Sequence, residues 1–246
     1  MKKNILFLSA LITVGFLTAC NDEGEKISPE ASEEVSLLVA ASVASNTYGV
    51  NALLQESVAL YQTAQGSANG RSAVCDYTDS GSEQISSTDG SMVTYNYSYS
   101  YDVSVNCSSI QVPVSLSVDF TYSGSFDGPK LTWSHDGNGD FEISLDANQN
   151  LVYNGTYDRS GEYNVKEREN INGSSNVDIT LTSLTIDPET QTIISGSGLY
   201  EIQVTRSDRS YTLKGSITFN GDGTASLIIN GSTVTFNLIS GNLIQD

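Results

Sequence analysis

The sequence predicts a mainly β protein, in which an antiparallel meander of about eleven strands curls into a barrel, half-barrel or sandwich after one or two short helices. Three observations support this fold class. Beyond residue 72, apolar and polar residues alternate over long stretches, as in strands with one buried face. Turn-forming Asn, Asp and Gly separate many of these stretches at short intervals, which favours hairpin connections. Helical spacing of apolar residues is confined to residues 29–66.

The segment 29–66 is predicted to be helical and to pack on the sheet. It begins at Ser28-Pro29-Glu30, where a capping serine precedes a proline at the first helical position and an early carboxylate. Apolar residues repeat at helical spacing around Leu38 and, after a break at residues 46–49, again around Leu54. We therefore expect two short helices, each with one apolar side.

The antiparallel β domain is predicted to span residues 72–246. In the stretch Val93–Cys107, apolar and aromatic residues hold most odd positions and polar residues the even ones, and a second alternating stretch runs from Val112 to Tyr122. Asn230-Gly231 is the clearest two-residue hairpin signal. Further strands are expected at 130–135, 141–145, 151–157, 162–168, 177–186, 192–205, 211–219, 224–229 and 234–239.

Residues 1–19 have the features of a secretory signal peptide. Lys2 and Lys3 supply a positive start, and residues 5–17 form an apolar stretch that is too short to span a bilayer comfortably. The stretch ends in Leu17-Thr18-Ala19-Cys20, which resembles the lipobox of bacterial lipoproteins. The resemblance implies cleavage before Cys20, transfer of a diacylglycerol to its sulfur and acylation of the new amine, with acyl chains such as palmitate as the membrane anchor. The alternative is an ordinary secretory signal followed by a chance cysteine.

Residues 20–28 are predicted to be an acidic tether. The run Asn21-Asp22-Glu23-Gly24-Glu25 resembles the surface-export signal of lipoproteins in the Bacteroidota, which implies exposure on the outer face of the outer membrane. The alternative is a solvated acidic spacer without a targeting role. The expected location is therefore the bacterial cell envelope, with the outer membrane as the membrane that carries the anchor.

The charge of the chain argues against several classes of partner. Without residues 1–19, 11 − 2 = 9 basic residues remain against 29 acidic ones, a formal charge of −20. Nucleic-acid binding is not expected, because no basic patch is available for phosphates, and attraction to anionic lipid headgroups is equally disfavoured. No cofactor is expected, since Gly196-Ser197-Gly198 lies within a strand pattern and lacks the helix and lysine of a phosphate loop.

Cys75 and Cys107 are predicted to form a disulfide. If Cys20 carries lipid, these two cysteines remain as a pair in an exported protein, where thiols meet an oxidising compartment. Two buried free thiols are the alternative, and metal binding is disfavoured because no histidine is nearby.

The segment Asp136-Gly137-Asn138-Gly139-Asp140 is a weak candidate for a metal site. Asp136, Asn138 and Asp140 place oxygen ligands at positions 1, 3 and 5, as calcium loops do, but the glycine and glutamate of the helix–loop–helix motif are missing. A hairpin turn is the favoured interpretation. The preceding His135 is interpreted as a strand-end residue held by a hydrogen bond, since no nucleophile elbow accompanies it.

Four tyrosines on one face of a single strand are a weak candidate for ligand binding; they are Tyr95, Tyr97, Tyr99 and Tyr101. Exposed rings could stack on glycans, whereas the same row could equally form part of the core. The opposite face of the strand carries Asn, Ser, Ser and Asp, which cannot be core, so the core interpretation is favoured.

Three functions are compatible with these features. The first is a non-catalytic binding or structural lipoprotein, favoured by the predicted anchor and by the lack of a catalytic constellation. The second is a carrier of an apolar ligand in a β-barrel cavity. The third and least favoured is a hydrolase with two facing carboxylates, for which the sequence offers many acidic residues but no diagnostic spacing. Beyond the membrane itself, the sequence does not distinguish a protein, glycan or lipid partner.

Overall fold

The computed structural model describes residues 28–66, 75, 77–88, 90–110, 112–166 and 171–244. Two α-helices and a short 3-10 helix come first: α1 (Pro29–Val43), η1 (Ser45–Thr47) and α2 (Val50–Gly66). The hydroxyl of Ser28 accepts a hydrogen bond from the backbone N–H of Ala31 at 3.3 Å, so α1 has the side-chain cap that the sequence predicts.

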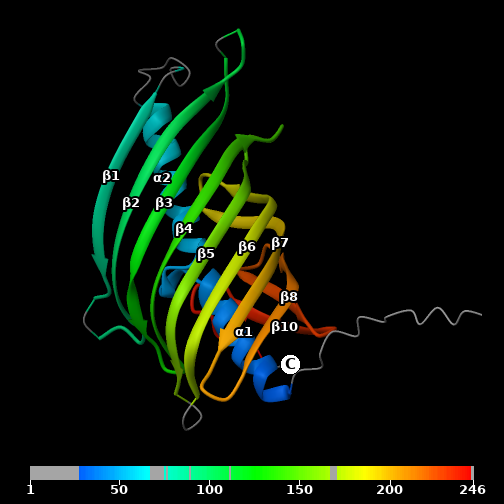
Figure 1. Ribbon diagram of the computed structural model, residues 1–246. Helices are drawn as coiled ribbons and strands as arrows, with labels where there is room; N and C mark the ends of the chain where they lie inside the picture. Colours follow the sequence, from blue (N-terminus) through cyan, green and yellow to red (C-terminus); the bar gives the residue numbers. More distant parts are fainter. Residues whose placement is uncertain are drawn as a thin grey trace, which may run out of the picture.

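All the strands belong to one antiparallel sheet in which each strand pairs with its neighbours along the chain. The strands are β1 (Thr78–Ser86), β2 (Thr94–Cys107), β3 (Pro113–Asp127), β4 (Leu131–Leu145), β5 (Leu151–Val165), β6 (Ile171–Asp187), β7 (Thr192–Thr205), β8 (Ser210–Phe219), β9 (Thr224–Ile229), β10 (Ser232–Asn237) and β11 (Leu243–Ile244). Among the described residues, β1 and β11 do not pair with each other, so the sheet is curled but open (Figure 1). The predicted meander is confirmed. Of the three predicted shapes, barrel, half-barrel and sandwich, the structure has the half-barrel.

The strand count agrees with the prediction, but the division of the chain does not. Each of β4 and β5 is one continuous strand of 15 residues, whereas the sequence was expected to break each into two. The predicted turn at 136–140 is wrong, because Asp136 to Asp140 pair with β5 without interruption. Asn172-Gly173, which falls between the strands expected at 162–168 and 177–186, lies inside β6. The strands β1 and β11 were not expected.

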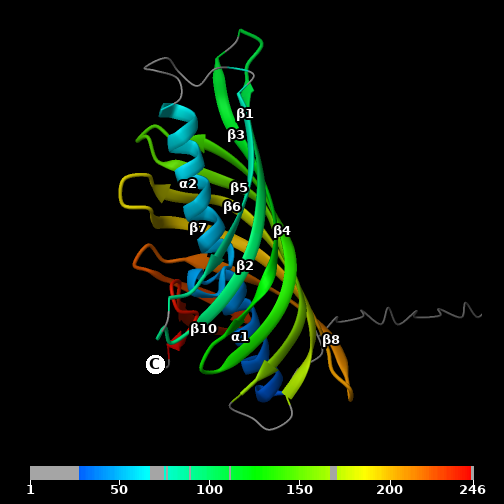
Figure 2. The same cartoon turned by 90° about the vertical axis from the view of Figure 1, so that its left-hand side faces the viewer.

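The two α-helices lie against the concave side of the sheet, as Figure 2 shows from the edge of the molecule. The helix α1 is buried on nearly all sides, with Val35, Leu38, Val39 and Val43 fully inaccessible to solvent. From α2, Leu53, Leu54 and Val58 join the same core. The space that a barrel would enclose is therefore occupied by helices, which supply the second layer that covers the apolar face of the sheet.

Aromatic side chains lie across glycines of the neighbouring strand at several places on this concave face. The cross-strand pairs are Tyr101–Gly81, Tyr97–Gly124, Tyr122–Gly137, Tyr163–Gly173 and Tyr200–Gly215. A glycine leaves room for the ring to lie flat on the sheet, and the ring in turn covers backbone that the glycine would leave bare. This repeated pairing suits a sheet that must curl closely around two helices.

Candidate functional site

The expected lipidation residue, Cys20, and the whole tether up to residue 27 lie outside the described residues. The described chain begins at Ser28, directly before α1. None of the helices in the described part of the chain is both long and apolar enough to cross a membrane.

The predicted disulfide is confirmed: Cys75 and Cys107 are bonded, with Cα atoms 5.8 Å apart. Cys107 is the last residue of β2, so the bond ties the segment that follows α2 to the end of the sheet.

The row of four tyrosines faces the helices, not solvent. Tyr97 and Tyr99 are buried, and the outer two rings are half-buried. The hydroxyl of Tyr97 donates to the carbonyl oxygen of Thr47 at 2.9 Å, and the ring of Tyr48 stacks on Tyr97 with centroids 4.9 Å apart. Because Tyr97 and Tyr99 are enclosed by helices, the row presents no open platform on which a sugar could stack.

The candidate metal ligands Asp136, Asn138 and Asp140 project from the outer face of β4 into solvent. Asn138 donates to the carboxylate of Asp158 at 3.1 Å and accepts from Thr121 at 3.3 Å, so it belongs to a cross-strand network. Nowhere in the described ranges do three His, Cys, Asp or Glu side chains gather closely enough to hold a metal ion.

His135 lies in the middle of β4 and is buried, so its expected place at a strand end is wrong. Aromatic rings surround it, with the centroids of Tyr97 and Trp133 at 5.3 and 5.4 Å. Neither imidazole nitrogen has a hydrogen-bond partner among the described residues, which contradicts the expected hydrogen bond. Burial, together with the positive charge of Arg159, lowers the pKa of His135 well below its ordinary value, so the ring is neutral.

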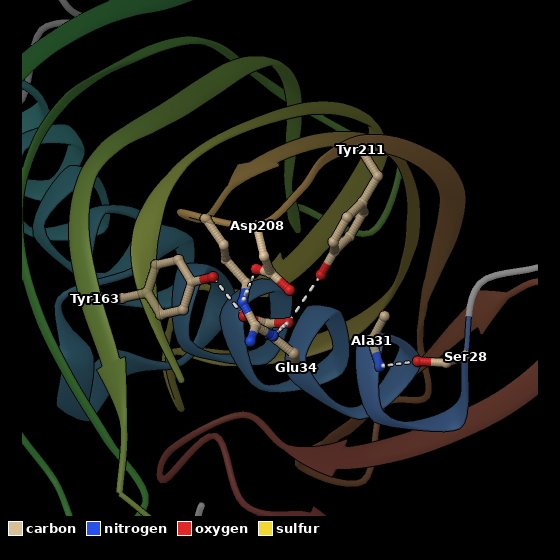
Figure 3. Close-up of polar contacts among 7 residues, drawn as sticks. Ser28, Ala31, Glu34, Tyr163, Asp208 and Tyr211 are labelled. Atoms are coloured by element: carbon tan, nitrogen blue, oxygen red, sulfur yellow. Dashed lines mark hydrogen bonds and ion pairs between the residues drawn. The ribbon is translucent and has the colours of Figure 1, made fainter. Parts of the chain in front are cut away.

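A buried carboxylate, Glu34 on α1, is the centre of the polar cluster drawn in Figure 3. The phenol of Tyr163 on β5 donates to one carboxylate oxygen, and the phenol of Tyr211 on β8 donates to the other at 2.9 Å. Arg206, in the turn between β7 and β8, forms an ion pair with Glu34 at 3.4 Å and another with Asp208 at 3.4 Å. We call these five residues the Glu34 cluster.

In the Glu34 cluster, both oxygens of the Glu34 carboxylate are hydrogen-bonded. Burial and the neighbouring carboxylate raise the pKa values of both Tyr163 and Tyr211, so the two phenols remain protonated donors. Because both carboxylate oxygens accept from these side chains, Glu34 is not a free general base. The cluster fixes the first turns of α1 to the ends of β5 and β8.

A second buried charge, Arg159 on β5, fixes the other end of α1. Its guanidinium donates to the carbonyl oxygens of Ala41 at 3.0 Å, Thr47 at 2.9 Å and Tyr48 at 2.7 Å. It also lies over the ring of Trp133, 5.2 Å from the centroid. A cation at the carboxyl end of a helix satisfies carbonyls that have no partner within the helix and opposes the negative end of its dipole.

Several hollows lie on the described part of the chain, and two of them bear on the position of the buried charges. An open groove of about 610 Å³ runs over the outer face of β2 to β5, where short polar side chains such as Asn96, Ser125 and Ser134 line it. A smaller hollow of about 250 Å³ lies between the end of α2 and β2 to β4, next to Leu116 and Ile143. Neither hollow contains Glu34 or Arg159, so the two buried charges do not face a ligand space there.

The outer face of the sheet is acidic. Asp158, Asp178 and Glu201 are direct cross-strand neighbours on β5, β6 and β7, and the row ends in an ion pair between Glu201 and Lys214 at 2.7 Å. A second row is Asp102, Asp119 and Asp140. Partial burial and the flanking carboxylates raise the pKa of the central residue of each row. A surface of this kind repels phosphates and favours solubility.

Comparison with known proteins yielded no match: no family model, no curated protein and no solved structure is significantly similar to this chain. Sequence reasoning missed the Glu34 and Arg159 clusters. One signal was available for the second, because Arg159 occupies the apolar parity of its strand between Tyr157 and Gly161.

Proposed function

We propose that this chain is a lipid-anchored lipoprotein of the bacterial cell envelope, and that its folded part is a non-catalytic binding or structural module. The lipobox-like segment Leu17–Cys20 supports the anchor, and the acidic run after Cys20 favours the outer face of the outer membrane. The membrane is then the constant partner, with a second partner recognised by the folded domain.

The contacts of the buried ionisable side chains support the proposal that the folded part is non-catalytic. Among the described residues, the buried ionisable side chains other than tyrosine are Glu34, His135 and Arg159. The hydrogen bonds of Glu34 join α1 to the sheet, and those of Arg159 join the end of α1 and the segment around η1 to it. His135 is neutral and enclosed by rings. An active site requires such groups to converge on a space that substrate can enter, which is not how they are used here.

The two alternative functions require rearrangements. A carrier with an apolar ligand inside the curl of the sheet would have to move α1 and α2 away from the concave face, where they fill the core. A carboxylate-dependent hydrolase would need two acidic residues facing each other in a cleft, whereas the carboxylate rows described above are lined up on an open face.

Fatty-acid labelling in cells tests the anchor. We expect the wild-type protein to incorporate an alkyne-tagged palmitate and to remain with the membrane after an alkaline wash. Cys20→Ala is expected to lose both properties, because no other residue of the lipobox-like segment can form the thioether. The matched control is Cys75→Ala/Cys107→Ala, which also removes cysteine but should keep the label.

Protease treatment of intact cells then tests exposure. Digestion of the wild-type protein, with a periplasmic marker protected, would support placement on the cell surface. Full protection of the protein would contradict that placement. Undiminished label on Cys20→Ala would contradict the anchor.

A further inference from the structure

The strand β1 presents one long edge without a partner strand among the described residues. The carbonyl oxygen of Tyr77 accepts from the N–H of Val105 at 3.0 Å, and the N–H of Ser87 donates to the carbonyl oxygen of Tyr95 at 3.0 Å. Since antiparallel bonds recur at every second residue, the odd residues of β1 bond to β2. The N–H and C=O groups of the even residues point away from the sheet; these residues are Thr78, Ser80, Ser82, Gln84 and Ser86. We call this row the β1 edge.

The opposite edge of the sheet is short and partly covered. There β11 is two residues long, and the chain just before it is covered by η1. The carbonyl oxygens of Leu238 and Ile239 accept from the N–H groups of Ser45 at 3.0 Å and Asn46 at 2.9 Å. Proteins commonly protect free edges in this way, or with lysine or proline in the edge strand. The sequence of β1, TDSGSEQIS, contains neither lysine nor proline, and its one local block is the carboxylate of Asp79, which accepts from the N–H of Ser80 at 2.9 Å.

Negative charge lies beside the β1 edge on the side that faces α2. Glu83 on β1 is the direct cross-strand neighbour of Tyr99, whose hydroxyl donates to the carboxylate of Glu56 on α2 at 3.4 Å. Burial and the charge of Glu83 raise the pKa of Glu56, so the two carboxylates act on each other. Neither α2 nor β1 contains a lysine or arginine to balance them.

We propose that the β1 edge receives an extended segment of a partner protein as a further antiparallel or parallel strand, and that this segment carries lysine or arginine on its α2-facing side. The unpaired backbone groups provide the hydrogen bonds of strand addition, and Glu83 with Glu56 provides the charge that selects a basic segment. The same carboxylates disfavour a second copy of this chain, because pairing two β1 strands would bring two Glu83 side chains together.

A defined probe tests the inference on the full mature chain in detergent micelles. The probe is a fluorescein-labelled peptide, acetyl-Thr-Lys-Thr-Lys-Thr-Lys-Thr-amide, with the same peptide carrying glutamate for lysine as its control. We expect the lysine probe to bind and the glutamate probe not to, and we expect slowed hydrogen exchange in the segment 78–86 when the lysine probe is bound.

Two pairs of variants separate the backbone from the charge. Ser82→Pro removes an N–H that points away from β2 and should lower the affinity for the lysine probe at least tenfold. Ser82→Ala keeps the N–H and should change that affinity less than twofold. Glu83→Gln should lower the affinity for the lysine probe at least threefold. Glu162→Gln removes the same charge from the outer face of β5 and should leave the affinity unchanged.

Several results would overturn the inference. These are the absence of probe binding, equal binding by a folded Ser82→Pro, equal binding of the glutamate probe, or dimers of the chain that form through residues 78–86. If Ser82→Pro does not fold, a probe methylated on every backbone nitrogen replaces it, and unchanged affinity of that probe would likewise reject strand addition.

Discussion

The side chain of Tyr122 on β3 reaches across Gly137 on β4 and donates a hydrogen bond to the carbonyl oxygen of Asp158 on β5, at 2.7 Å. One phenol thus spans three neighbouring strands of the sheet. The relationship repeats where Tyr200 crosses Gly215 to the carbonyl oxygen of Ile228 at 3.0 Å. The curl of the sheet therefore depends on pairs of residues that are distant along the chain.

Substitution of Gly137 by alanine should destabilise the fold by about 3 kcal/mol, the upper part of the range for an overpacked site. A Cβ atom there would lie 2.7 Å from the Cζ of Tyr122 and closer still to the carbonyl oxygen of Asp158, and backbone cannot move aside cheaply. Urea unfolding followed by circular dichroism measures the change. Gly128→Ala is the control, since its Cβ would meet ordinary contacts from 3.4 Å outward. Equal stability of the two variants would contradict the role of Gly137.

Replacement of Arg159 by methionine should lower the free energy of unfolding by about 3 kcal/mol. Methionine fills similar space but removes the guanidinium hydrogen bonds to the carbonyl oxygens of Ala41, Thr47 and Tyr48. The first two oxygens keep one other side-chain donor each, the hydroxyls of Thr47 and Tyr97. Chemical denaturation is again the measurement, with the exposed Arg209→Met as the control. A stability loss below 1 kcal/mol for Arg159→Met would show that the α1 end does not depend on this cation.

Stability should fall as the pH drops below about 6.5, the ordinary pKa of histidine. The folded state keeps His135 neutral because burial and Arg159 lower its pKa, whereas the unfolded chain takes up the proton. The unfolded state then binds more protons, so each further pH unit removes about 1.4 kcal/mol from this residue's contribution until the folded pKa is reached. His135→Phe keeps a ring in the aromatic cluster and removes the titration.

The difference in unfolding free energy between wild type and His135→Phe isolates this effect from the titration of the carboxylates. It should be constant from pH 7 to 8 and should shift steadily in favour of the variant from pH 6 to 4. A difference that stays flat over the whole range would mean that His135 is protonated equally in both states.

Loss of the Cys75–Cys107 disulfide should lower stability by about 3–4 kcal/mol by the chain-entropy relation, given the separation of 32 residues between its ends. Thermal unfolding of Cys75→Ala/Cys107→Ala beside wild type gives the value. Reduction of the wild type should reproduce the loss, whereas reduction should leave the double variant unchanged. A double variant as stable as the oxidised protein would contradict a stabilising bond.

The meander and the two helices could be predicted because they depend on local patterns. Alternation over Val93–Cys107 and helical spacing within 29–66 are signals that each segment carries by itself. The strand β1 was missed because its sequence is almost entirely polar, as suits an edge. The continuous β4 was missed because Asp136 to Asp140 has turn composition. Its glycines are explained only by side chains that lie over them, Tyr122 at Gly137 and Phe141 with Leu53 at Gly139.

The polar clusters could not be predicted for a related reason. Glu34 and Tyr163 are 129 positions apart, and Arg159 and Ala41 are 118 apart, so no local pattern links the partners. A carboxylate within the α1 sequence is typical of an exposed helix face, and burial became favourable through two phenols and an arginine supplied by β5, β8 and the turn before β8. Such pairings are decided by how the sheet curls, which the sequence left open among three closures.

The intact mass of the mature protein, purified from membranes, tests the proposed anchored module most directly. The account predicts a chain that begins at Cys20 and carries the added mass of a diacylglyceryl group and an amide-linked acyl chain, with the mass of the remainder reduced by two hydrogens for the Cys75–Cys107 bond. A chain that begins at another residue, or that begins at Cys20 without lipid, would contradict it.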